Sequence, residues 1–180
     1  MKLWACPKCH QQLHLENKTL KCENNHCYDI SKRGYINLLL NPDKATNNPG
    51  DSKESLVARK AYLNKGYYDP ILNQVITCID EFKHQDDLSI LDLGCGEGYY
   101  TQGLKKHFEN SDIYGLDISK IDIDMATRYR KDVTWLVGNS KNIPILDHSL
   151  DFICALFTVV NQDELKRALK EDGYIVHVTA

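Results

Sequence analysis

The amino-acid sequence predicts an α/β domain with a parallel sheet, preceded by a small cysteine-rich module. From Ser89 onward, short apolar runs alternate with segments of helical periodicity, which is the pattern of strand–helix–strand units. Four of the seven cysteines fall within the first 27 residues, and the other three are scattered. A chain of 180 residues has room for one ordinary domain plus such a module.

Composition and charge narrow the class of protein. A hydrophobic share of 42% is enough for a packed core. No apolar run is as long as a membrane span, and the N-terminus lacks the layout of a signal peptide. We therefore expect a cytoplasmic protein without a membrane partner. Residues 1–48 carry a net charge of +3 and the remainder carries −6, so an anionic polymer would bind at the front of the chain.

The front module has the ligand spacing of a structural zinc site. Its sequence contains the pattern Cys6-x2-Cys9-x12-Cys22-x3-His26. Two cysteines on a tight turn, with a second pair from a facing hairpin, can surround one tetrahedral ion. The module has little apolar sequence, so metal binding would supply most of its folding free energy, about 10–16 kcal/mol. Four ligands would close the coordination shell and make the metal structural.

Two alternatives remain open for these residues. Cys27 is adjacent to His26 and could be the fourth ligand in its place, and two more histidines lie nearby. Cys6 and Cys9 could also be free thiols or a redox pair in a cytosolic protein. A redox motif, however, would not need the second pair of ligands.

The composition divides the chain into three parts. We expect the zinc-binding module at 1–40, a linker rich in Pro, Asn and Gly at 41–51, and the α/β domain at 52–180.

Two helices are expected before the first strand of the α/β domain. The first runs from Ser52 to about Asn64 and follows an N-cap box formed by Asp51 and Glu54. The second begins at the stretch GYYDP, with Asp69 as N-cap and Pro70 in the first helical position.

The α/β pattern then predicts five strands and three helices. The strands are expected at 89–93, 112–117, 133–138, 150–157 and 174–179, and the helices at 100–108, 121–130 and 163–169. Parallel strands of this kind bind ligands at their carboxyl ends.

A glycine-rich turn follows the first of these strands, with the spacing Asp92-x-Gly94-x-Gly96-x-Gly98. Dinucleotide enzymes use G-x-G-x-x-G, and a P-loop needs a lysine and a serine or threonine, so neither pattern matches. An acid two residues before the first glycine would disfavour a phosphate and suit an amino-acid group. S-adenosylmethionine has an amino-acid group, a ribose and an adenine but no phosphate. The sequence therefore predicts this cofactor.

Two later loops support the prediction. Asp117 ends the second strand, where an acid can accept hydrogen bonds from ribose hydroxyls. Asn139 and Ser140 follow the third strand, where the edge of an adenine would lie. The alternative is a doubly wound domain with tight turns and no cofactor.

The quoted motifs resemble known families. LDLGCGEGYYTQGL, GLDIS and GNSKNIP resemble motifs of class I S-adenosylmethionine-dependent methyltransferases, which have a Rossmann-like parallel sheet. CPKCHQQL…KCENNHCYDISKRGYINLLL and GDSKESLVARKAYLNKGYYDPI resemble the bacterial 23S rRNA (guanine-N1)-methyltransferases of the RlmA type. The likeness extends from Cys6 to Val178 and implies methylation of guanine N1 in a hairpin loop of 23S rRNA. It also implies that the zinc module recognises this RNA.

The resemblance also implies roles for individual residues. The zinc ligands would be the three cysteines and the histidine named above. Tyr68 would close over the cofactor, with Gly96 and Glu97 beside it. Tyr68 could instead be an aromatic residue that packs on the sheet at a helix start. Family members are linked to macrolide-type antibiotic resistance.

The sequence departs from the family in two places. The loop after the fourth strand reads ALFTVVNQDE and lacks the Pro-Cys pair that relatives have near the target base. The chain ends on the fifth strand, whereas a class I domain continues with two more strands, so an incomplete sheet with an unprotected edge is expected.

The sequence leaves several functional questions open. A base in an RNA loop is splayed out and stacked on aromatic side chains. The available aromatic residues are Trp4, Tyr28, Tyr35, Tyr67 and Phe157. The general base is not identified. The oligomeric state is open, with a homodimer as one option. Alternative functions are a noncatalytic zinc-dependent RNA-binding protein and a small-molecule methyltransferase.

Overall fold

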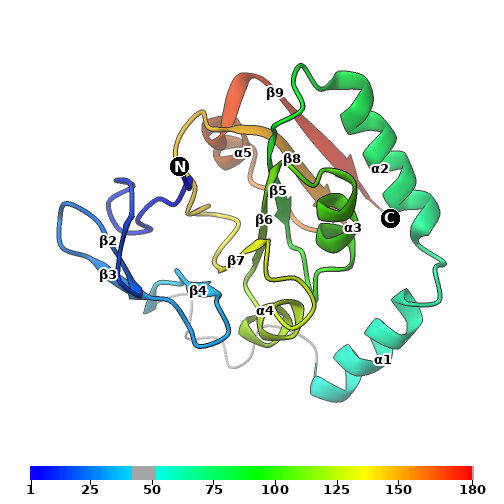
Figure 1. Cartoon of the computed structure of the whole chain (residues 1–180), viewed down its shortest axis with the longest axis horizontal. Helices are drawn as coiled ribbons and strands as arrows, with labels where there is room; N and C mark the ends of the chain where they lie inside the picture. The colour runs from blue at the N-terminus through cyan, green and yellow to red at the C-terminus, as the bar shows by residue number, and fades with distance from the viewer. Residues whose placement is uncertain (42–51, 180) are drawn as a thin grey trace.

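The computed structural model of the chain describes residues 1–41 and 52–179 (Figure 1). It contains a small three-stranded sheet and a larger six-stranded sheet that is flanked by helices. Of the predicted linker at 41–51, all but Asn41 lies outside the described residues.

The small sheet belongs to the front module. Its strands pair antiparallel in the order β1-β2-β3, with bounds β1 His14–Glu16, β2 Thr19–Lys21 and β3 Cys27–Asp29. β1 and β2 form the hairpin that the sequence predicted between the two pairs of ligands.

The large sheet has the order β4-β7-β6-β5-β8-β9, and every neighbouring pair is parallel. Its strands are β4 Ile36–Asn37, β5 Ser89–Leu93, β6 Asp112–Asp117, β7 Thr134–Val137, β8 Leu150–Leu156 and β9 Leu169–Val178. The helices are α1 Lys53–Leu63, α2 Asp69–Phe82, α3 Tyr99–His107, α4 Lys120–Ala126 and α5 Gln162–Ala168. None of the helices that the structure describes has the length and apolar character needed to span a bilayer.

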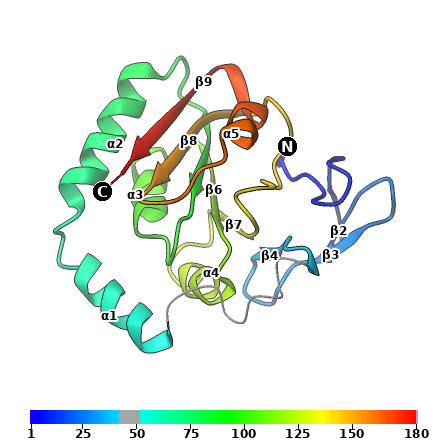
Figure 2. The same cartoon turned by 180° about the vertical axis from the view of Figure 1, so that it is seen from behind.

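The two faces of the large sheet are covered by different parts of the chain. Because successive side chains of a strand point to opposite faces, Ile90 of β5 packs with α2, α3 and α4, whereas Leu91 and Leu93 pack with α5 and the front module. The strands are therefore buried on both faces, as their continuous apolar runs predicted. Figure 2 shows the small sheet at the side of the large one, beyond β4 and β7.

The front module shares a core with the α/β domain. Leu13 and Leu20 of the module are buried in the same apolar cluster as Leu136 and Ile143. β4 also joins the large sheet beside β7, where Ile36 is paired with Leu136. The module that we expected at residues 1–40 thus includes a strand, β4, that is part of the large sheet. A strand of two residues is too short to produce a periodic signal in the sequence.

Several element ends differ from the sequence prediction. The N-cap of α1 is Ser52, whose hydroxyl accepts from the Ser55 amide at 3.2 Å, and Asp51 lies outside the described residues. Asp69 is the first residue of α2 rather than its cap. α4 ends at Ala126 instead of residue 130, and β9 begins directly after α5 at Leu169. Local signals place helix and strand ends only to within a few residues.

Gly98 provides a test of how closely α3 packs on the sheet. Its φ is +88°, and a Cβ would lie 2.5 Å from Trp135 Cη2. Gly34 has a similar φ of +96° but no neighbour within 4 Å of a Cβ. We expect Gly34→Ala to lower the free energy of unfolding by about 1–2 kcal/mol, the strain of a left-handed alanine. Gly98→Ala should lower the free energy of unfolding by about 1–3 kcal/mol more than Gly34→Ala does, because the methyl group also overpacks the core.

Urea unfolding followed by circular dichroism measures both losses. Equal losses in the two variants would show that Trp135 moves aside and that the close approach at Gly98 is unimportant for stability.

Candidate zinc site and cofactor cavity

Two similar turns bring the predicted zinc ligands together. In the first turn, the His10 amide donates to the Cys6 carbonyl at 2.8 Å, and in the second the Asn25 amide donates to the Cys22 carbonyl at 2.9 Å. His10 and Asn25 both have positive φ, at 59° and 61°, which reverses the chain just after Cys9 and just before His26. The ligand atoms of Cys6, Cys9, Cys22 and His26 all lie within 4.8 Å of one another.

The separations of these atoms suit a tetrahedral zinc ion. With Zn–S bonds of about 2.3 Å and Zn–N bonds of about 2.0 Å, two sulfurs would lie about 3.8 Å apart and sulfur and nitrogen about 3.5 Å apart. Cys9 Sγ and Cys22 Sγ are separated by 3.7 Å. His26 Nδ1 lies 3.4 Å from both Cys6 Sγ and Cys22 Sγ. The four side chains therefore fit the ion.

Neighbouring groups also favour these four ligands. Cys27 is exposed, and its Sγ lies 3.4 Å from the Asn25 carbonyl, away from the cluster. A backbone hydrogen bond with Gln11 lowers the pKa of Cys9 to about 6, which favours the metal-binding thiolate, whereas burial raises the pKa of Cys22. The Tyr28 hydroxyl lies 3.3 Å from Cys6 Sγ and can donate to it. Burial and the adjacent Cys6 raise the pKa of Tyr28, so this hydroxyl keeps its proton.

A cavity of about 410 Å³ lies at the carboxyl ends of β5, β6, β7 and β8. This volume is in the ordinary range for a small-molecule site. Five of the predicted cofactor residues line it, namely Gly94, Gly96, Asp117, Asn139 and Ser140. The other four, Tyr68, Asp92, Glu97 and Gly98, are not among its lining residues.

The glycine turn shapes one wall of this cavity. Gly94 has a φ of +71°, and a Cβ there would lie 2.4 Å from Thr158 Oγ1. At Gly96, with a φ of +55°, the nearest atom to a Cβ would be Arg59 Nη2 at 4.0 Å. Gly94 thus allows the loop after β8 to approach, and Gly96 leaves open space that a ligand can occupy.

Asp117 is held in place by two backbone amides. Its Oδ2 accepts from the Gly96 amide at 2.9 Å, and its Oδ1 accepts from the Ser119 amide at 2.8 Å. Each oxygen retains a lone pair that can accept from a hydroxyl group. The carboxylate lines the cavity at the end of β6, where the sequence placed the ribose.

Asp92 points into the core rather than into the cavity. Alternation along β5 puts its side chain on the same face as Ile90, under the glycine turn. It is 1% exposed and accepts a hydrogen bond from Thr101 Oγ1 at 2.6 Å. Burial, with smaller contributions from Asp117 and Glu97, raises the pKa of Asp92 to about 7. Glu97 is also buried, at 3% exposure.

Tyr68 is not among the lining residues of the cavity, but it contacts Phe157, which is. The two rings make an edge-to-face contact with centroids 6.4 Å apart. Phe157 lines the cavity, is 47% exposed and has a φ of +56°. Such a backbone conformation is rare for an aromatic residue and is commonest at functional sites.

Two charged residues that line the cavity were not among the residues predicted from the sequence. Arg59 comes from α1 and Asp122 from α4. Asp122 Oδ1 is buried without a hydrogen-bond partner among the described residues, and burial raises the pKa of Asp122. An acceptor left open at the cavity suits the hydroxyl and amino donors of S-adenosylmethionine. A charged residue on a surface helix gives no sequence signal for such a role.

Family models match both parts of the chain. A zinc-ribbon model described as "RlmA, N-terminal" matches residues 4–45, and a model described as "Methyltransferase domain" matches residues 90–173. The front module thus matches the N-terminal zinc ribbon of RlmA proteins, and the following domain matches a methyltransferase domain. The α/β part of the chain has the class I S-adenosylmethionine-dependent methyltransferase fold, and the front module is a zinc ribbon with a four-residue ligand cluster.

Individual relatives are similar to this chain over nearly all of its length. A Bacillus subtilis (strain 168) protein named "Putative 23S rRNA (guanine-N(1)-)-methyltransferase YxjB" is 30% identical over 98% of this chain and 64% of its own length. The "23S rRNA (guanine(748)-N(1))-methyltransferase" of Streptomyces fradiae is 28% identical over 97% of this chain and 62% of its own length. The chain thus spans less than two thirds of either relative.

A solved structure has the same fold as the α/β part. The TehB-like SAM-dependent methyltransferase from Corynebacterium glutamicum superposes with a TM-score of 0.54 at 26% identity, covering 69% of this chain and 70% of that one.

The ligand set can be tested with two cysteine variants. We expect Cys22→Ser to lose most of its zinc, because a serine hydroxyl does not replace a cysteine thiolate as a ligand of structural zinc. Zinc per chain is measured by mass spectrometry of the purified protein. The matched control Cys27→Ser should keep about one zinc per chain. Full zinc in Cys22→Ser, or its loss from Cys27→Ser, would contradict the assignment.

The buried carboxyl group of Asp92 should make stability depend on pH. Its pKa in the folded chain, about 7, is above the ordinary value of 3.8, so the folded state holds this proton more tightly than the unfolded state. The resulting stabilisation is complete below about pH 4 and is lost as the pH rises through 7, at about 1.4 kcal/mol per pH unit.

Asp92→Asn removes this titration. Urea unfolding at pH 5 and pH 8 should show that the variant gains stability relative to the unsubstituted chain as the pH rises. Zinc binding changes with pH in both proteins alike, so it cancels in the comparison. A constant difference between the two proteins would contradict the raised pKa.

Proposed function

We propose that the chain transfers the methyl group of S-adenosylmethionine to N1 of a guanine in a hairpin loop of 23S rRNA. The names of the two relatives support this reaction. Within the structure, one observation carries the proposal: the loop between β7 and β8 both lines the cofactor cavity and contacts the zinc ribbon. The rRNA substrate would place the reaction in the cytoplasm.

This β7–β8 loop belongs both to the cofactor cavity and to the contact with the zinc ribbon. Its first residues, Gly138 to Ser140, line the cavity. Further along, Asn142 Nδ2 donates to the Pro7 carbonyl at 2.9 Å, and the Pro144 carbonyl accepts from the Ala5 amide at 3.0 Å. An RNA bound by the ribbon would therefore be held next to the cofactor. A small-molecule methyltransferase would have no use for this coupling.

The cavity residues have separate roles in this proposal. Asp117 would accept hydrogen bonds from the ribose hydroxyls, and Asn139 and Ser140 would contact the adenine. When bound, S-adenosylmethionine would supply an already activated sulfonium methyl group. The main task of the chain is then to align the guanine with it. Guanine N1 must also lose its proton to a base, for which we assign no side chain.

Phe157 is the aromatic residue best placed to stack on the target base. It lines the cavity and is half exposed, and its ring is supported from one side by Tyr68. Of the other aromatic candidates, Tyr35 is buried in the core, and Trp4 and Tyr28 pack against the ribbon core. Tyr67 is exposed but is not among the residues that line the cavity. A base splayed out of an RNA loop is typically stacked in this way.

Methyl transfer and its site can be measured together. The chain is incubated with tritiated S-adenosylmethionine and a transcript of a 23S rRNA hairpin, and the product is read by reverse transcription. A methyl group on guanine N1 blocks base pairing, so extension should stop at the modified guanine. Bound RNA without tritium transfer would instead indicate the noncatalytic RNA-binding alternative.

Two variants of β6 test the cofactor residues. Asp117→Ala should weaken S-adenosylmethionine binding at least about tenfold, because it removes charge-assisted hydrogen bonds to the ribose. Asp112→Ala, at the other end of the same strand, removes only an exposed ion pair with Lys2 and should leave binding unchanged. Calorimetric titration measures both affinities. Equal affinities in the two variants would exclude the role of Asp117.

A further inference from the structure

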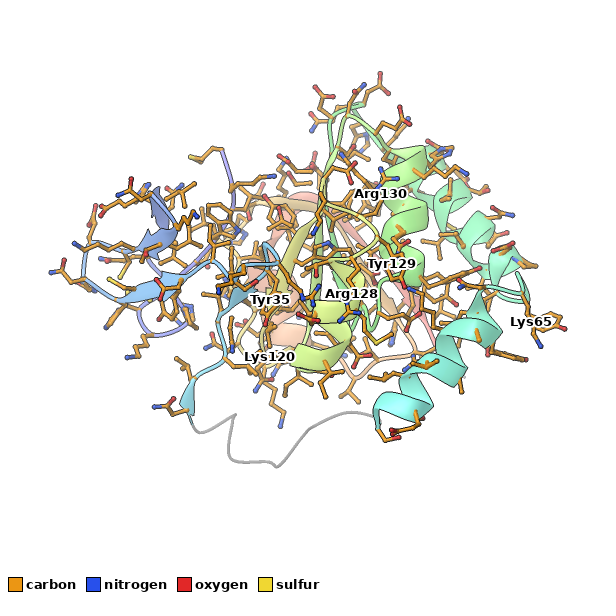
Figure 3. All side chains as sticks on the ribbon, turned by 60° about the horizontal axis from the view of Figure 1, so that its bottom comes forward. Tyr35, Lys65, Lys120, Arg128, Tyr129 and Arg130 are labelled. Carbon is orange, nitrogen blue, oxygen red and sulfur yellow. The ribbon has the colours of Figure 1, made fainter. Side chains whose placement is uncertain are left out.

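A groove between α1 and α4 carries basic side chains that the cofactor site does not use. Its volume is about 560 Å³, and Lys60, Lys120, Arg128 and Tyr129 are among the residues that line it. Figure 3 shows Lys120, Arg128 and Tyr129 on the α4 side, between the β4 segment and α1. The rest of the groove wall is largely apolar.

The charge of this groove is positive. The single acidic side chain among its lining residues is Asp124. Asp124 already forms ion pairs with Arg33 Nε at 2.9 Å and with Arg128 Nη2 at 3.2 Å. Lys120 is exposed and has no ion pair within the part of the chain that the structure describes. The groove is thus a positive region on an α/β part whose sequence is acidic overall.

The ammonium group of Lys60 reinforces this charge from within the groove. It lies over the ring of Tyr129 in a cation–π contact. Its Nζ is buried and has no hydrogen-bond partner among residues 1–41 and 52–179. Tyr129 itself is 53% exposed. A cation without a carboxylate partner, next to an open aromatic ring, is suited to a ligand that carries both phosphates and flat bases.

The position of the groove links the other two sites. On α1, Arg59 lines the cofactor cavity and its neighbour Lys60 lines the groove. On α4, Asp122 lines the cavity and Asp124 lines the groove. Arg33, which pairs with Asp124, belongs to the segment that leads out of the zinc ribbon. The groove therefore lies next to the cavity and is connected to the ribbon.

We propose that this α1–α4 groove binds the phosphate backbone of a single-stranded stretch of the RNA substrate. The inference rests on the proposed function and adds a surface outside the ribbon that holds the RNA. Lys120 and Arg128 contact phosphates, and Tyr129 with the apolar wall accepts a base. An acidic protein segment would match the charge, but it would not use an exposed aromatic ring beside the cations.

The test compares two double variants with the same change in charge. Lys120→Gln/Arg128→Gln removes two cations from the groove. Lys106→Gln/Lys166→Gln removes two exposed cations that do not line it. The probe is a fluorescein-labelled 12-nucleotide oligouridine, which has no stable secondary structure, and affinity is measured by anisotropy from 50 to 300 mM NaCl.

We expect the groove variant to bind the probe at least about fivefold more weakly than the control variant at 100 mM NaCl. The slope of log K against log salt should fall by about 1.4, since each lost phosphate contact on a single strand contributes about 0.7. Tyr129→Leu should also weaken binding, and Tyr129→Phe should not. Binding of S-adenosylmethionine should remain unchanged in all four variants, which shows that they are folded.

Other results of the RNA-binding and methyl-transfer measurements would contradict the groove proposal, the proposed reaction, or both. If the groove and control variants bind RNA equally, the proposal is overturned, whether or not methyl transfer occurs. If the unsubstituted chain does not bind the oligouridine, the groove proposal is overturned, and the hairpin transcript of the methyl-transfer assay tests the proposed rRNA substrate separately. If the groove variant alone loses RNA binding but no variant transfers methyl groups, the groove is supported and the proposed reaction fails.

Discussion

The hydrogen bond from the Gly96 amide to the Asp117 carboxylate connects the two loops on which the cofactor cavity depends. It joins the turn after β5 to the end of β6 at 2.9 Å. The bond forms because the parallel register pairs Leu93 with Leu116 and so ends both strands at the same level. Glycine is favoured at position 96 because the backbone is left-handed there, and the absence of a side chain leaves the space beside the turn open. The polar wall of the cavity is thus a consequence of strand register.

The zinc ribbon is attached to this framework by more than a linker. Its apolar residues share a core with β7 and the β7–β8 loop, and its backbone bonds to that loop. Residues of the ribbon and of the cavity wall are therefore held in one packed unit. In the proposed function this attachment has a physical role, because a module that is to direct RNA to the cavity must have a fixed orientation.

Parts of the site could be predicted because they depend on local spacing. Cys6, Cys9, Cys22 and His26 lie on two short turns, and the spacing within each turn is enough to indicate a shared metal. Asp117 and Asn139 follow apolar strands, and the carboxyl ends of parallel strands meet at one edge of the sheet. Asp92 is different. The sequence placed it at the end of a strand, but only the packing of α3 on β5 showed that its side chain faces the core, where it accepts from Thr101.

The sequence by itself determined the order of strands and helices, the glycine turn and the spacing of the metal ligands, because these depend on residues close together in the chain. The tertiary structure decided which residues from distant elements meet. It placed β4 beside β7, Arg59 and Asp122 in the cavity, and Lys60 with Tyr129 in the groove. A charged residue on an exposed helix has the same local pattern whether it faces solvent or a binding site. Only the packing of α1 and α4 against the sheet distinguishes the two.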